Sequence, residues 1–131
     1  MKIVVLKFGG TSVGSLERIK KIVKIIAAYK KKKLKVIVVS SAMSGMTNDL
    51  IKKSLELSNN FDSAEYDILL SLGEQMSCAL IAGRLIHLGH KARSWMSWQI
   101  PIITDGPYSA ARINKIHKKN IIKFINSGGI P

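Results

Sequence analysis

Cysteine is almost absent from this chain, which excludes a disulfide-stabilised fold. Cys78 is the single cysteine among the 131 residues, so no internal disulfide can form. It lies in an apolar helical pattern, which favours a reduced thiol in a core over a nucleophile or a metal ligand.

Long hydrophobic runs are also lacking. The apolar run over residues 3–6 is ended by Lys7, too early for a signal peptide. No run approaches the roughly 20 apolar residues that span a bilayer. Because 47% of the residues are hydrophobic, the chain is not expected to be disordered. We expect one cytoplasmic domain with a buried core and no membrane partner.

Acidic residues are few, and the charge is therefore strongly positive. Eight Asp and Glu residues stand against 21 Lys and Arg residues, giving a formal charge of +13. Clustered lysines can bind nucleic acid by releasing counterions. However, the longest basic run, at residues 30–33, falls where a helix should end, and cations stabilise that position. The chain lacks zinc-finger spacing and RNA-binding aromatic motifs, so we do not expect a nucleic-acid partner.

Residues 3–14 read as a buried strand, a glycine turn and the start of a helix. The unbroken apolar letters of residues 3–6 predict a strand covered on both faces. Gly9 and Gly10 would let the backbone approach a ligand, the helix N-terminus would attract an anion, and Lys7 would add a positive charge. This combination suits phosphate. The glycine spacing matches neither the dinucleotide nor the P-loop motif, so an ordinary turn stays an equal alternative.

The following residues predict a parallel β-α-β unit. Apolar residues recur at helical spacing over residues 16–27, and Ser15 can cap that helix. Residues 34–40 form a second apolar strand. A crossover of this kind is right-handed and parallel, and ligands bind beyond the carboxyl ends of such strands. The turns at Gly9 and Gly45 should therefore lie at one edge.

The loop after the second strand is rich in hydroxyl groups. Ser41, Ser44 and Thr47 supply them, and either Thr47 or Asn48 can cap the next helix. Hydroxyls beside a helix N-terminus suit a carboxylate ligand. The alternative is that these residues only cap and turn the chain.

Helical patterns follow from about residue 63 to residue 88, interrupted at Gly73. Glu74 lies near the apolar stripe of this region. A glutamate that faces inward needs a partner, because an unpaired buried carboxylate is costly. The alternative is a partly exposed residue in the first turn of a helix.

The last third of the chain predicts two strands and a helix. The strands cover residues 91–95 and 100–104, residues 112–116 are ambiguous, and a helix around residues 121–125 ends at residues 127–129. Trp95 and Trp98 are interpreted as packing residues, since no interleaved basic groove accompanies them.

Three segments together resemble the aspartokinases, within the amino-acid kinase family. They are Lys7-Phe8-Gly9-Gly10-Thr11-Ser12-Val13, Ser40-Ser41-Ala42-Met43-Ser44-Gly45-Met46-Thr47-Asn48 and Gly73-Glu74-Gln75-Met76-Ser77. They occur in the family's order. The resemblance implies an α/β fold, a three-layer sandwich with a mostly parallel central sheet, here incomplete. Residues 1–131 would be the N-terminal part of the catalytic domain, without the rest of the nucleotide lobe or the ACT domains.

The resemblance also implies a reaction. Aspartokinases transfer a phosphoryl group from ATP to the β-carboxylate of L-aspartate, giving 4-phospho-L-aspartate on the way to lysine, threonine and methionine. The roles implied here are catalysis by Lys7, ATP-phosphate binding by Lys7, Phe8, Gly9 and Gly10, and aspartate binding by Ser41, Thr47 and Glu74. Ser41 and Thr47 would bind the carboxylates and Glu74 the ammonium. We assign no protein metal ligand, since Mg²⁺ would be held by the nucleotide phosphates.

The resemblance covers only part of an aspartokinase, so the chain is expected to be a truncated or split form. A separate chain would then supply the missing C-terminal part, and the complete enzyme would be a homo-oligomer. The alternative is a non-catalytic remnant, or a basic interaction module that retains the fold. Because an incomplete parallel sheet leaves a strand edge open, we expect marginal stability or self-association.

Overall fold

The computed structural model describes residues 2–131. Within them the chain forms four strands and four helices, in the order β1 (Ile3–Phe8), α1 (Leu16–Lys31), β2 (Lys35–Ser40), α2 (Met46–Leu57), α3 (Ser63–His87), β3 (Ile102–Asp105), β4 (Arg112–Ile116) and α4 (Lys119–Asn126).

The predicted β-α-β unit is confirmed. β1 and β2 pair in parallel, with Ile3 opposite Lys35 and Phe8 opposite Ser40. α1 crosses between them, and the Ser15 side chain caps it by accepting a hydrogen bond of 3.2 Å from the Arg18 N–H. The fold is α/β with a parallel sheet, as predicted.

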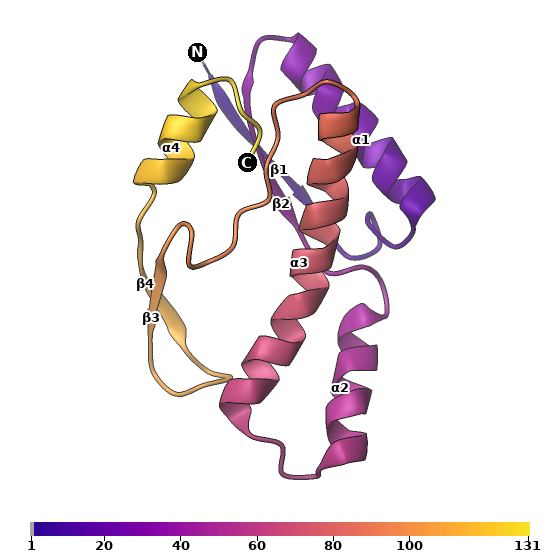
Figure 1. The fold of residues 1–131 in the computed structure, drawn as a ribbon, viewed down its shortest axis with the longest axis vertical. Helices are drawn as coiled ribbons and strands as arrows, with labels where there is room; N and C mark the ends of the chain where they lie inside the picture. Colours follow the sequence, from indigo (N-terminus) through magenta and orange to yellow (C-terminus); the bar gives the residue numbers. More distant parts are fainter. Residues whose placement is uncertain (1) are drawn as a thin grey trace.

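Helices lie on both sides of this strand pair. Figure 1 shows α1 and α3 on one side and α4 with the β3–β4 hairpin on the other. The core lies on the α1–α3 side, where Ile26, Val36 and Leu85 are almost fully buried. The side chains of Val4 and Leu6 pack against this core.

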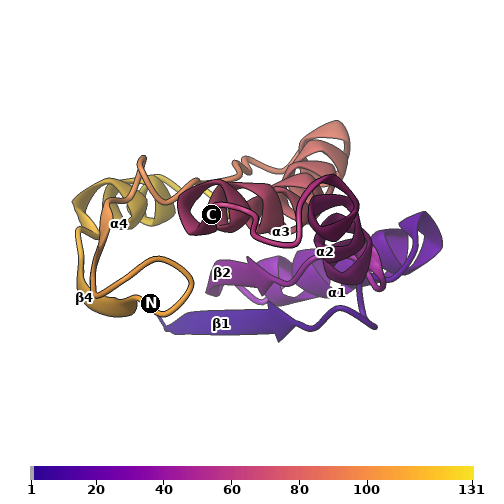
Figure 2. The ribbon, with the colours of Figure 1, turned by 90° about the horizontal axis from the view of Figure 1, so that it is seen from below.

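The prediction that β1 is buried on both faces is wrong. Its side chains alternate between half-buried and exposed, and Val5 keeps 58% of its surface exposed. Alternation places Val5 on the face opposite to the core. α4, the helix on that side, packs against β2 instead. Figure 2 shows β1 at the outer edge of the molecule.

The prediction of a strand over residues 91–95 is also wrong. Only Ala92 makes a bridge, a parallel one with Ile130. The carbonyl of Pro131 in turn accepts a hydrogen bond of 2.9 Å from the Val38 N–H. Residues 130–131 therefore lie between β2 and residues 91–95.

β3 and β4 form an antiparallel hairpin outside the parallel pair. β3 begins two residues later than predicted, and the ambiguous residues 112–116 are strand β4. The hairpin tip is tied to α3 by Asp67, whose carboxylate accepts hydrogen bonds from the Ser109 N–H at 2.8 Å and the Ser109 hydroxyl at 3.1 Å.

α3 is a single continuous helix of 25 residues, so Gly73 does not interrupt it as predicted. Its N-terminus is capped by the Asp62 carboxylate. Gly73 serves close packing instead, because a Cβ atom built there would lie 2.7 Å from the Cβ atom of Ala42. This approach brings the loop after β2 onto the middle of α3.

By length and composition α3 could also cross a membrane, which was not expected from the apolar runs. In the structure it contacts α1, α2 and β2. The core helices of globular domains pass the same length and composition test.

The end of the chain largely follows the prediction. α4 ends before Ser127, and Gly128 adopts the left-handed φ of +86° that is common just after a helix. Trp95 packs as expected, with its ring 5.5 Å from that of Phe124 in an edge-on arrangement. Trp98 does not, since 67% of its surface is exposed.

Candidate functional site

The three motif segments meet beyond the carboxyl ends of β1 and β2. The Ser41 N–H donates to the carbonyl of Phe8 at 3.0 Å, which joins the loops that follow the two strands. The Ala42 N–H donates to Oε1 of Glu74 at 3.2 Å, which joins the second loop to α3. Residues that lie far apart in the sequence thus share one side of the molecule, as predicted.

The glycine turn is built around one carbonyl group. The Gly9 carbonyl accepts hydrogen bonds from the N–H groups of Ser12, at 2.9 Å, and Val13, at 3.3 Å. A Cβ atom at Gly9 would meet no atom within 4 Å, whereas one at Gly10 would lie 3.2 Å from the Ala42 carbonyl oxygen. Gly10 is therefore needed for packing between the two loops, and Gly9 borders open space that a ligand can enter.

The helix after this turn lies farther from the glycines than expected. Residues 11–15 separate Gly10 from α1, and Ser15 caps the helix itself. The N-terminus of α1 is thus not directly behind the glycines. Instead, the guanidinium of Arg18 donates to the carbonyl of Thr11 and brings a second cation to the turn. The sequence analysis missed Arg18, because only the turn brings these two residues together.

Lys7 and Phe8 point to opposite faces of β1. Lys7 is exposed, lies opposite Val39 in the register, and forms no ion pair within residues 2–131. Phe8 packs against the core, and its carbonyl already accepts the Ser41 N–H. Lys7 is therefore free to neutralise an anion, whereas Phe8 has only a positioning role toward one.

The loop after β2 leads into α2 through a left-handed glycine. Gly45 is the N-cap, with a φ of +82°, and no side chain caps the helix. The prediction that Thr47 or Asn48 is the cap is wrong, because the turn at Gly45 starts the helix before either residue. In the described part of the chain, neither the Ser41 nor the Thr47 hydroxyl makes a hydrogen bond, so both are available to a ligand.

Glu74 lies in the middle of α3, not in the first turn of a helix. Its side chain is exposed, and Oε1 accepts the Ala42 N–H. Oε2 has no partner among residues 2–131, so one carboxylate oxygen stays open to a cation. The sequence analysis also missed Ser77, which is fully buried and donates to the carbonyl of Ser41 at 2.7 Å.

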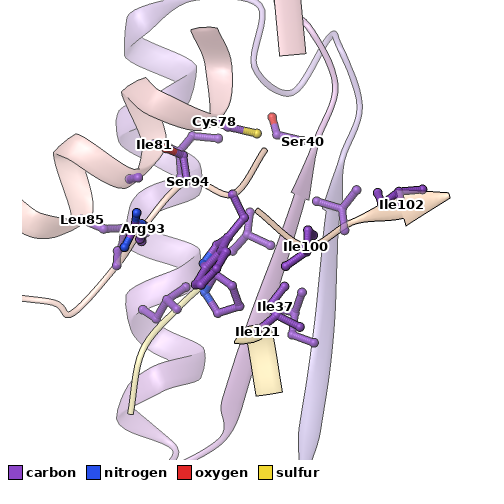
Figure 3. A pocket seen from close by; sticks show the side chains of 17 residues that line it. Ile37, Ser40, Cys78, Ile81, Leu85, Arg93, Ser94, Ile100, Ile102 and Ile121 are labelled. Atoms are coloured by element: carbon purple, nitrogen blue, oxygen red, sulfur yellow. The ribbon is translucent and has the colours of Figure 1, made fainter. Parts of the chain in front are cut away.

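An apolar cavity of about 300 Å³ lies on the other side of this loop, between β2, α3 and the end of the chain (Figure 3). Ser40 and Cys78 line it together with isoleucines, whereas Lys7 and Glu74 do not. Burial, and to a smaller extent the Glu74 carboxylate, raise the pKa of Cys78 above the ordinary value for a thiol. A mainly apolar lining does not suit an anion.

Known proteins share this sequence pattern. A model of the amino acid kinase family matches residues 2–131. The aspartokinase of Rickettsia conorii is 44% identical over 134 residues, and that of Geobacillus stearothermophilus is 42% identical over 130 residues. These alignments include 100% and 99% of the chain but only 33% and 32% of the relatives. The chain thus spans about a third of the length of the curated relatives that it matches.

Solved structures share its fold. The aspartate kinase from Synechocystis superposes with a TM-score of 0.81 at 30% identity, covering 98% of this chain and 21% of that one. Aspartokinase III of E. coli, in complex with aspartate and ADP, superposes with a TM-score of 0.78 at 19% identity, covering 99% and 40%. The α/β architecture and the match over nearly the whole sequence agree, and the chain belongs to the amino acid kinase family.

Proposed function

We propose that this chain is the aspartate-binding part of an aspartate kinase, which phosphorylates the β-carboxylate of L-aspartate with ATP. The observation that carries the proposal is the position of the loop after β2. It is bonded to β1 through Phe8 and to α3 through Glu74, so the three segments that resemble aspartokinases converge. The relatives named aspartokinase support the same substrate class.

Each proposed role is the one that the resemblance to aspartokinases implies, and the chemistry of the group suits it. Lys7 faces the transferring phosphoryl group, and the open backbone at Gly9 approaches the ATP phosphates, beside Gly10 and the positioning residue Phe8. The hydroxyls of Ser41 and Thr47 bind substrate carboxylates, and Oε2 of Glu74 accepts the ammonium. In phosphoryl transfer the protein mainly positions the reactants and neutralises charge, which suits this set of groups.

Further parts of the proposal extend beyond residues 2–131. Mg²⁺ would arrive with the nucleotide phosphates, which are its usual ligands in kinases. A cytoplasmic location and a homo-oligomer of the complete enzyme belong to the same proposal. So does a role at the start of lysine, threonine and methionine synthesis. The remaining lobe would come from further residues of the protein or from a separate chain.

Binding of L-aspartate, measured by isothermal titration calorimetry, tests the proposal. Glu74→Gln keeps a carbonyl oxygen for the Ala42 N–H but removes the charge that attracts the ammonium. We expect this variant to bind aspartate about tenfold more weakly, since hydrogen bonds to charged groups contribute about 1.5–3 kcal/mol. Glu65→Gln, an exposed carboxylate in the first turn of the same helix, is the matched control and should bind normally.

Aspartate-dependent hydroxamate formation with ATP then tests catalysis, with the chain alone and with added downstream fragments of aspartokinases. Activity only in the mixture supports a split enzyme. A chain that neither binds aspartate nor becomes active with any fragment contradicts the proposal. Salt-sensitive binding of an acidic partner would then favour the alternative, a basic interaction module, which the charge of +13 permits.

A further inference from the structure

One peptide group in the loop after β2 is held at both ends by α3. The carbonyl of Ser41 accepts a hydrogen bond of 2.7 Å from the Ser77 hydroxyl. The N–H of the same peptide, that of Ala42, donates to Oε1 of Glu74 at 3.2 Å. Glu74 and Ser77 are three residues apart in a helix and so lie on the same face. Two neighbouring side chains of α3 thus hydrogen-bond to the same peptide group, Ser41–Ala42.

The acceptor nearest to the Ser77 hydroxyl lies in the loop after β2, not in α3 itself. Its oxygen lies 3.3 Å from the Gly73 carbonyl and 3.2 Å from the Glu74 carbonyl, both farther than the Ser41 carbonyl. The Ser41 carbonyl also accepts the Ser40 hydroxyl at 3.1 Å, but Ser40 belongs to the strand that precedes the loop. Within residues 2–131, Ser77 alone bonds this carbonyl to another element.

The packing around Ser77 excludes water from its hydroxyl group. Ser77 is fully buried, so water does not replace its hydroxyl. One turn earlier, Gly73 lets the Ala42 side chain lie directly against α3. A rotated peptide would break the bond between Ser77 and the Ser41 carbonyl and leave the Ser77 hydroxyl only the longer contacts to the Gly73 and Glu74 carbonyls. The loss of one such hydrogen bond costs about 0.5–1.5 kcal/mol.

We infer that Ser77 is a positioning residue for the aspartate site. By holding the Ser41–Ala42 peptide, it fixes the place from which the Ser41 hydroxyl projects. The same peptide keeps Oε1 of Glu74 occupied, so that Oε2 faces the ligand. The link to aspartate rests on the proposed function, whereas the hold on the peptide does not.

Amide hydrogen exchange at Ala42, followed by NMR, tests this hold without any ligand. Ser77→Ala should speed exchange at Ala42 about tenfold, the effect of losing one buried hydrogen bond, and weaken aspartate binding by a similar factor. Ser54→Ala is the matched control, because the Ser54 hydroxyl is equally buried but donates only to Ile51 in its own helix, at 2.8 Å. It should change neither quantity.

Two controls distinguish a local effect on the Ser41–Ala42 peptide from a general loss of stability. Ser77→Thr keeps the hydroxyl and should restore slow exchange, while the amides of Val23 and Val36 should exchange normally in every variant. Should Ser77→Ala fail to fold, Ser77→Cys keeps the volume but donates weakly and is expected to show the same fast exchange. Unchanged exchange at Ala42 in Ser77→Ala or Ser77→Cys would overturn the inference. Fast exchange in a chain whose wild type binds no aspartate would overturn only the proposed function.

Discussion

Two glycines of α3 differ in how closely other atoms pack against them. A Cβ atom at Gly73 would lie 2.7 Å from the Cβ atom of Ala42, whereas one at Gly83 would meet nothing within 4 Å. Gly73→Ala should therefore lower the free energy of unfolding by about 1–3 kcal/mol, as overpacking does. Gly83→Ala should raise it by about 0.5–1 kcal/mol, since alanine favours the helix. Urea unfolding of both variants measures the difference, and equal effects would contradict the packing described at Gly73.

The reactivity of the Cys78 thiol should depend on pH differently from that of an exposed cysteine. Burial and the nearby Glu74 carboxylate raise the pKa of its thiol, so the neutral form persists at pH values where an exposed thiol has begun to ionise. Because the thiolate is the nucleophile, alkylation by iodoacetamide should be slower than that of a free cysteine at pH 8. The midpoint of the alkylation rate as a function of pH should lie at higher pH than for free cysteine. A rate profile that coincides with free cysteine would contradict this environment, and unfolding in urea, which removes the burial, is the control.

Among the elements, the tip of the β3–β4 hairpin is bonded to α3 through one side chain, that of Asp67. Asp67 of α3 accepts two hydrogen bonds from Ser109 at the hairpin tip. Asp67→Ala should release the tip and speed trypsin cleavage after Arg112 several-fold, because proteolysis follows local opening. Glu65→Ala, in the same turn region of α3, should leave cleavage unchanged. An equal rate in both variants would show that other contacts hold the hairpin.

The elements also show how far a sequence pattern reaches. Helical periodicity predicted α1 and α4, and the apolar runs predicted β1 and β2, because these signals are local. The Ser15 cap was correctly predicted for the same reason. The strand over residues 91–95 was not correctly predicted, since a strand depends on a partner far away in the sequence, and here Ala92 alone of these five residues makes a bridge, with Ile130.

On the face of the parallel pair opposite to the core, several apolar side chains stay exposed, although α4 packs against β2 there. Val5 is 58% exposed, and Ile3 and Val39 are each 46% exposed, on the face opposite to the core. We expect the chain to self-associate, since an exposed apolar face beside an open strand edge favours pairing. Val5→Thr should weaken the association seen by sedimentation velocity, whereas Leu57→Thr, at an 81% exposed position on α2, should not. A monomer at all concentrations, with one sharp unfolding transition, would contradict this prediction.

The sequence by itself determined the order of the elements, the parallel β-α-β unit and the set of residues available for a site, because periodicity, capping and glycine turns act over a few residues. Only the tertiary structure decided which of these residues meet. The bond from Ser77 to Ser41, the bond from Ala42 to Glu74 and the approach of Ala42 to Gly73 all join residues more than 30 positions apart. Such contacts depend on how elements pack, and no local pattern records them.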